Sequence, residues 1–165
     1  MERPIDTGGG QAKRSPRIER MARRERAMMV PRQSPEEPGL VTVDATWGAI
    51  TPIELAPGVR TVGELEVLER IENNGPIVDT RLAHFYRAGT IPGALNLPHD
   101  RIEAELARLD RETATVFFCN GPQCAATPDA IRTLLTLGFP AGSILFYRGG
   151  IHDWMTLGLP IEPPS

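Results

Sequence analysis

The chain has 165 residues, with 18 basic and 21 acidic side chains and a formal net charge of −3. This length fits one domain plus additional chain rather than two full domains. The balanced charge gives no overall basic field for nucleic acid or anionic lipid. No apolar run reaches the roughly 18 residues that a membrane span needs, so we expect a cytoplasmic protein with neither a membrane nor a nucleic-acid partner. Two cysteines cannot build a disulfide framework.

The first 40 residues differ in composition from the rest. They contain none of the nine aromatic residues but nine of the 18 basic ones. Such a segment buries too little apolar surface to offset its ordering entropy, so we predict a disordered extension over 1–40. Its stretch from Lys13 to Arg32 carries a local charge of +6. That stretch is typical of a solvated tail, a targeting peptide or a contact site for an anionic partner. We interpret 41–60 as a lead-in segment and 61–163 as the folded domain.

The first predicted helix begins at Thr61–Glu64, whose sequence matches a capping box. Leu65, Leu68 and Ile71 follow at the spacing of one helix face. The Asn-Asn-Gly-Pro sequence at 73–76 is a stop signal. The pattern therefore predicts a helix that ends before residue 73.

Turn residues and apolar spacing predict the remaining elements. Short apolar or β-branched runs predict strands at 77–79, in the latter part of 91–97, at 115–118 and at 144–147. Helical spacing predicts helices at 100–109, at 127–137 with Thr127 as N-cap and Gly138 as stop, and around Trp154. The alternation of strands and helices is typical of an α/β fold with a largely parallel, buried sheet.

Cys119 directly follows the apolar strand at 115–118, and a loop and a helix come after it. Ligands collect at the carboxyl ends of strands in open α/β sheets, and a loop that enters a helix directs backbone N–H groups at one point. We therefore expect the pKa of the Cys119 thiol to be lowered and the thiolate to be a nucleophile. A cysteine that merely packs as a small apolar side chain gives the same pattern. Neither Cys-x-x-Cys nor zinc-ligand spacing is present in the sequence, so no metal site is predicted.

Four segments together carry a family resemblance. In chain order they are Asp79-Thr80-Arg81, Gly89-Thr90-Ile91-Pro92-Gly93-Ala94, Val116 to Cys119 with Gly121, and Tyr147-Arg148-Gly149-Gly150 with Trp154 and Gly158-Leu159-Pro160. This ordered set resembles the rhodanese family. The resemblance implies a rhodanese-like three-layer α/β domain, in which helices flank a five-stranded parallel sheet. It also implies that Cys119 is the nucleophile that carries sulfur. Thr90 stands where the family usually has histidine.

The resemblance further implies a sulfurtransferase without a cofactor. Cys119 would take sulfur from thiosulfate or a persulfide and pass it to cyanide, a thiol or a protein cysteine. Backbone N–H groups of the following loop would bind the anionic persulfide. That substrate-binding loop consists of Asn120, Gly121, Pro122, Gln123 and Cys124. Arg148 is the candidate anion-binding side chain, and Asp79 and Arg81 are expected to support the loops structurally.

Cys124, the second cysteine, has two interpretations. It is either a structural residue at the end of the loop, or a resolving thiol that attacks the persulfide and forms a Cys119–Cys124 disulfide. We expect a loop that surrounds an anion to point its side chains apart, which argues against a disulfide.

Two other functions are compatible with parts of the pattern. A rhodanese fold can be a non-catalytic binding or regulatory module, with the basic tail engaging a partner. A cysteine phosphatase or arsenate reductase needs an arginine at the sixth position after its cysteine as a bidentate clamp. Ala125 occupies that position here, so this third function is disfavoured.

Overall fold

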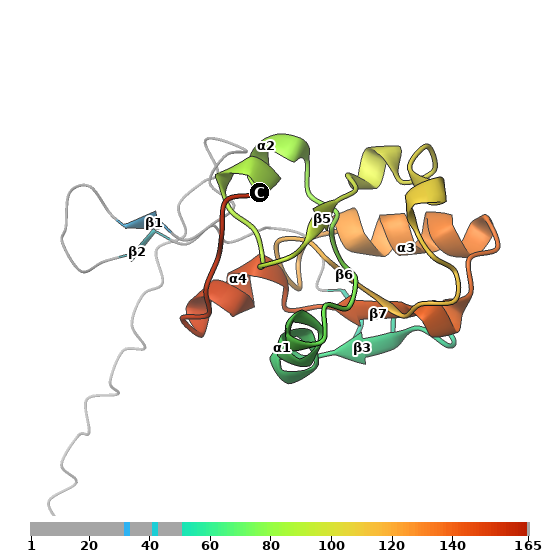
Figure 1. The fold of residues 1–165 in the computed structure, drawn as a ribbon, viewed down its shortest axis with the longest axis horizontal. Coiled ribbons are helices and arrows are strands. Elements are labelled where there is room, and N and C mark those ends of the chain that lie inside the picture. Colours follow the sequence, from blue (N-terminus) through green and yellow to red (C-terminus); the bar gives the residue numbers. More distant parts are fainter. Residues whose placement is uncertain (1–31, 34–40, 43–50, 165) are drawn as a thin grey trace, which may run out of the picture.

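The structure is a computed structural model that describes residues 32–33, 41–42 and 51–164 (Figure 1). Five strands form one sheet in the spatial order β3 (Arg60–Val62), β7 (Ile144–Tyr147), β6 (Thr115–Phe118), β4 (Ile77–Asp79) and β5 (Leu95–Asn96). All four neighbouring pairs are parallel. The five-stranded parallel sheet implied by the sequence is therefore confirmed, and β6 is its central strand.

Helices cover both faces of this sheet (Figure 1). The α-helices are α1 (Glu64–Glu72), α2 (Ala83–Ala88), α3 (Ala126–Thr136) and α4 (Gly150–Thr156), and 3₁₀ turns lie at His99–Arg101, Leu106–Arg108 and Ala141–Ser143. Ile131 of α3 packs in one apolar cluster with Phe117 of β6. Val67 of α1 and Trp154 of α4 pack in the second cluster, on the opposite face. The three layers follow from these two clusters.

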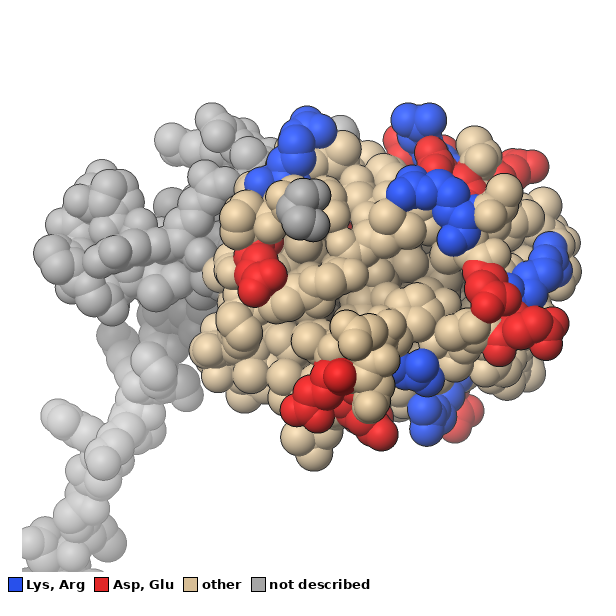
Figure 2. Space-filling view, viewed as in Figure 1, with Lys and Arg blue, Asp and Glu red and all other residues tan. Residues whose placement is uncertain are grey.

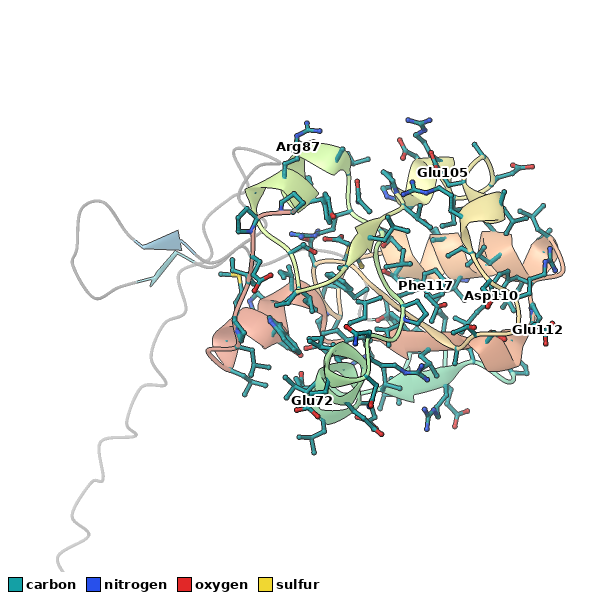
Figure 3. The ribbon with its side chains drawn as sticks, in the orientation of Figure 1. Glu72, Arg87, Glu105, Asp110, Glu112 and Phe117 are labelled. Carbon is teal, nitrogen blue, oxygen red and sulfur yellow. The ribbon has the colours of Figure 1, made fainter. Side chains whose placement is uncertain are left out.

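The alternation of side chains along β6 explains why there are two clusters. Phe117 belongs to the cluster under α3, whereas its neighbours Val116 and Phe118 belong to the other one. Successive residues of a strand point to opposite faces, so a strand covered on both faces reads as a continuous apolar run. Figure 3 shows Phe117 inside the domain, while the acidic side chains labelled there, such as Glu72 and Glu112, lie at its periphery.

Most of the predicted elements are confirmed. These are the strands at 77–79, 115–118 and 144–147, the extended piece within 91–97, and the helices after residue 63, before Gly138 and around Trp154. The strand β3 and the helix α2 were not predicted, because each is short and lacks a clear apolar period.

The start of α1 differs from the prediction. Thr61 lies in β3, which pairs with β7, and the N-cap is Gly63. The Gly63 N–H donates to a carboxylate oxygen of Glu66 at 3.0 Å. The capping contact is therefore real but lies two residues later, because the sheet uses the preceding residues as an edge strand. The buried apolar residue of this helix is Val67, whereas Leu65 is 79% exposed.

The predicted helix at 100–109 is wrong. Two 3₁₀ turns occupy its place, at His99–Arg101 and Leu106–Arg108. Backbone bonds such as that from the Arg108 N–H to the Glu105 carbonyl span three residues instead of four. Ile102 is nevertheless buried in the cluster under α3. The apolar spacing thus identified the buried face, but tight turns satisfy the backbone without a continuous helix.

Thr127 is not the N-cap of α3. The helix begins at Ala126, with Ala125 as its N-cap. The Thr127 hydroxyl is fully buried and lies 2.8 Å from the hydroxyl of Thr80. Its side chain is used for a contact between two segments 47 residues apart.

The basic stretch from Lys13 lies outside the described residues, apart from its last residue. Within 1–40 the described residues are Arg32–Gln33, which form β1 and pair antiparallel with β2 (Val41–Thr42). Among the described residues, every helix is too short or too polar to cross a membrane. Figure 2 shows acidic and basic side chains mixed around the margin of one face of the domain.

Candidate active site

Cys119 lies at the carboxyl end of the central strand and is 2% exposed. Two backbone bonds tie this point to the start of α4. The Ile151 N–H donates to the Cys119 carbonyl at 2.9 Å, and the His152 N–H donates to the Asn120 carbonyl at 2.8 Å. The loop after β6 is therefore held by the helix that follows β7.

Gly150 makes this close approach possible. Its φ is +62°, in the left-handed region that favours glycine. A Cβ atom at this position would lie 2.5 Å from the Cys119 carbonyl oxygen and 2.7 Å from the Gly121 nitrogen. Both contacts are with backbone, which cannot move aside without shifting the loop. Gly150, the second glycine of the Gly149-Gly150 motif, is thus required sterically next to Cys119.

The middle of the loop is anchored by the segment that precedes the domain. The Pro122 carbonyl accepts hydrogen bonds from the Thr51 N–H at 2.7 Å and from the Thr51 hydroxyl at 2.9 Å. Arg148 in turn donates from Nε to the Thr51 carbonyl at 2.9 Å. The structure thus gives Arg148 a positioning contact to the loop through Thr51. Its role as an anion-binding side chain stays a prediction.

The two cysteines of the loop contact each other. The Cys119 thiol donates to the Cys124 carbonyl oxygen at 3.7 Å, and each thiol shifts the pKa of the other. The Thr127 N–H donates to the Cys119 sulfur at 3.5 Å, and the Asn120 side-chain amide donates to the Cys124 sulfur at 3.7 Å. The expectation that the loop points its side chains apart is therefore wrong for these two thiols. A turn closed by the Cys124 N–H and the Gly121 carbonyl, at 3.0 Å, brings Cys124 back towards Cys119.

The pKa values of the two thiols shift in opposite directions. Burial raises the pKa of Cys119 well above its usual value, and its hydrogen bond to Cys124 adds to this effect. The hydrogen bond from Cys119 lowers the pKa of Cys124 to about 6, and hydrogen bonds from Asn120 and the Ala126 backbone contribute. The expectation of a lowered pKa at Cys119 is wrong, because desolvation there outweighs its contacts with Thr127. Cys124 is the thiol that ionises first.

Asp79 and Arg81 form a buried ion pair at the end of β4. The Nη2 atom of Arg81 lies 2.6 Å from a carboxylate oxygen of Asp79 and donates to the Gly89 carbonyl at 2.7 Å. The Thr90 hydroxyl donates to the same Asp79 oxygen at 2.8 Å. These contacts fix the chain between β4 and β5. The supporting role of the pair in the active site stays a prediction.

Thr80, between these two residues, links this region to the active-site loop. Its N–H and its hydroxyl donate to the Phe118 carbonyl, at 2.9 and 3.0 Å. The same hydroxyl contacts Thr127, whose N–H reaches the Cys119 sulfur. Sequence reasoning missed Thr51 and the pair Thr80 and Thr127, because each makes its decisive contact with a residue far away in the chain. The Thr127 hydroxyl, between Ala126 and Pro128 at the start of α3, was the one available signal.

No cluster of three or more metal-ligating side chains is present among the described residues. The loop from 119 to 126 has no charged side chain, so any anion bound there would be stabilised by N–H donors and by α3.

The model of the rhodanese-like domain family matches residues 64–157, more than half of the chain. The chain belongs to the rhodanese-like family. The matched range contains both cysteines, the Asp79–Arg81 pair and Gly150. The family resemblance seen in the sequence is thereby confirmed.

Two curated relatives and a solved structure are similar to this rhodanese-like chain. An HTH-type transcriptional regulator of Mycobacterium tuberculosis is 34% identical over 98 residues, which are 59% of this chain and 42% of the regulator. The chain thus spans less than half the length of that relative. A sulfurtransferase of Allochromatium vinosum is 33% identical over 89 residues, or 54% of this chain and 79% of that protein. A rhodanese-related protein from Thermoplasma volcanium superimposes with a TM-score of 0.54 at 22% identity, covering 64% of this chain and 99% of the other.

Proposed function

We propose that this rhodanese-like domain is a sulfurtransferase that carries sulfane sulfur as a persulfide on Cys119. The donor is thiosulfate or a persulfide, and the acceptor is cyanide, a thiol or a protein cysteine. The observation that carries the proposal is the position of Cys119 at the carboxyl end of the central strand, with the Thr127 N–H on its sulfur. The sulfurtransferase relative supports the same chemistry.

The first step is a proton transfer between the two thiols. Cys124 ionises first, and the thiol proton that must leave Cys119 is donated to the Cys124 carbonyl oxygen. Transfer of this proton gives a Cys119 thiolate and a neutral Cys124. A general base must lie within hydrogen-bond reach of the proton that it abstracts, and the Cys124 thiolate, whose pKa responds to Cys119, is the candidate. Removal of its negative charge also lowers the repulsion on the new thiolate.

The Cys119 thiolate then attacks the outer sulfur of thiosulfate. A bond forms between the Cys119 sulfur and this sulfane sulfur, and the sulfur–sulfur bond of thiosulfate breaks. Sulfite leaves with the electron pair, and Cys119 holds an anionic persulfide. Stabilisation of that anion by N–H groups fits the Thr127 N–H and the N-terminal end of α3. In the third step the acceptor attacks the outer sulfur of the persulfide and regenerates the Cys119 thiolate.

The test is sulfur transfer to cyanide, measured as thiocyanate, with thiosulfate and separately with glutathione persulfide as donor. We expect turnover by the wild-type chain with at least one donor, and background rates for Cys119→Ser. Serine is nearly isosteric but is not ionised at neutral pH and cannot carry a persulfide. Circular dichroism should show the same fold for both proteins. Wild-type turnover by Cys119→Ser, or none by the wild-type chain with either donor, would overturn the proposal.

A non-catalytic regulatory module is the second candidate. The observation in its favour is the likeness to a transcriptional regulator, together with the burial of Cys119. In this case the basic stretch within 1–40 would engage a partner. Failure of Cys119 to gain sulfur from either donor, with partner binding that depends on 1–40, would favour this function over transfer.

We further propose a cytoplasmic location, with small-molecule sulfur donors and acceptors as partners and neither membrane nor nucleic acid. Both cysteines are unpaired, which suits a reducing compartment.

A further inference from the structure

The two neighbouring thiols of the loop, Cys119 and Cys124, can carry out a reaction beyond sulfur transfer. Cys119 and Cys124 are both free and both buried, and the Cys119 thiol donates to the Cys124 carbonyl oxygen at 3.7 Å inside one short loop. Proton transfer uses Cys124 only as a base. Its sulfur is also a nucleophile that lies beside the atom on which the persulfide forms.

We propose that Cys124 resolves the Cys119 persulfide, so that the domain also reduces sulfane sulfur to sulfide and becomes a disulfide in the process. This inference rests on the proposed function, since it needs sulfur on Cys119. The proton that Cys124 took from Cys119 passes to the outer sulfur of the persulfide, and the resulting Cys124 thiolate attacks the inner sulfur. A bond forms between the two cysteine sulfurs, the bond to the outer sulfur breaks, and hydrosulfide leaves with the electron pair. The two cysteines are oxidised, and the sulfane sulfur is reduced.

Two contacts and a difference in exposure favour attack by Cys124. The turn closed between Cys124 and Gly121 brings the second sulfur back to the first. The Asn120 amide donates to the Cys124 sulfur at 3.7 Å and stabilises its anionic form. Cys124 is 8% exposed and Cys119 is 2% exposed, so the attacking residue is the less buried of the two.

The reaction balances without an added oxidant, because the sulfur donor supplies the oxidising equivalent. Release of hydrosulfide leaves an intramolecular disulfide. Two equivalents of a small thiol such as glutathione then restore both thiols by exchange. A strong thiophile such as cyanide competes with Cys124 for the same persulfide. The partition between transfer and sulfide release is thus set at Cys124.

The experiment is a single turnover of the full chain, fully reduced, under anaerobic conditions with thiosulfate and no thiol. Sulfite, sulfide, intact mass and the disulfide map are measured. The wild-type chain should release one sulfide for each sulfite and lose about 2 Da as a Cys119–Cys124 disulfide forms. Cys124→Ser and Cys124→Ala should release sulfite but little sulfide, and should keep a mass gain of roughly 32 Da. Endpoints are compared rather than rates, since both variants also lose the base.

A wild-type chain that keeps the added sulfur, without sulfide or disulfide, would overturn the resolving role and leave the sulfurtransferase intact. Sulfide release that persists in both Cys124 variants would also overturn it. A wild-type chain that releases neither sulfite nor sulfide from thiosulfate, and gains no sulfur from glutathione persulfide, would overturn both proposals together. Unchanged circular dichroism spectra of the variants exclude misfolding as the cause of any loss.

Discussion

Two neighbouring strands of the sheet end in buried polar groups of opposite character. β4 ends in a full charge, Asp79, which is neutralised by Arg81 and further held by Thr90. β6 is followed by Cys119, whose loop has no Lys, Arg, Asp or Glu and holds two thiols with opposite pKa shifts. The comparison teaches that the fold pairs the buried charge at the end of β4 with an opposite charge. It leaves titratable groups where chemistry is needed.

The largest expected effect is the loss of stability when the Asp79–Arg81 ion pair at the end of β4 is broken. Asp79→Asn removes the charge that Arg81 requires, and an unpaired buried charge costs about 3–5 kcal/mol. A thermal melt should show a fall in Tm of about 12 °C or more, at about 4 °C or more per kcal/mol for a small domain.

Asp129→Asn is the matched control, because its ion pair with Arg132 is exposed on α3. Surface pairs contribute about 0–1 kcal/mol, so its Tm should move by a few degrees at most. Equal losses in the two variants would show that the Asp79–Arg81 pair is not the anchor that its burial indicates.

The next largest effect is expected from a side chain added at Gly150, against the loop that follows β6. Gly150→Ala places a methyl group against the Cys119 carbonyl and forces a residue with a side chain to adopt a φ of +62°. We expect a loss of about 1–3 kcal/mol in stability, and a larger proportional loss of sulfur transfer, since the loop must shift.

Gly142→Ala is the control for this variant, because nothing lies within 4 Å of its added Cβ and its φ is not positive. It should leave both stability and transfer near wild-type values. Retention of full transfer by Gly150→Ala would mean that the loop tolerates displacement at the cysteine.

The position of Cys119 after β6 was predictable from the sequence, whereas the order in which the two thiols ionise was not. The apolar run at 115–118 predicts a buried strand whatever packs on it, so Cys119 falls at a strand end by local rules alone. The order of ionisation of the two thiols depends on burial and on a loop turn, which no local pattern encodes. The bond from Thr51 to Pro122 joins residues 71 positions apart, and the sequence carries no signal for it.

The pH dependence of persulfide formation sharpens the contrast between the two regions. Cys124 has a pKa of about 6, so above this pH it is ionised and can accept the proton of Cys119. Below it both thiols are protonated, and the rate should fall about tenfold per pH unit. Stopped-flow measurement of sulfite release would give the profile. In Cys124→Ser the inflection should move to alkaline pH, because burial raises the pKa of Cys119. An unchanged profile in that variant would remove Cys124 from the proton transfer.

The smallest effect concerns the link between the two regions, the hydrogen bond of 2.8 Å between the Thr80 and Thr127 hydroxyls. Thr127→Val removes this bond but keeps the shape of the side chain and the backbone N–H that donates to Cys119. Thr80 still donates to the Phe118 carbonyl, so no donor is left unpaired. We expect a loss of about 1 kcal/mol and sulfur transfer within about twofold of wild type, measured by chemical denaturation and the thiocyanate assay. Thr80→Val should cost more, because it also removes the bond to Phe118. A fall in transfer of more than about twofold in Thr127→Val, with a stability loss of only about 1 kcal/mol, would contradict this expectation. It would show that the link from the end of β4 positions the thiols, rather than merely supporting the loop.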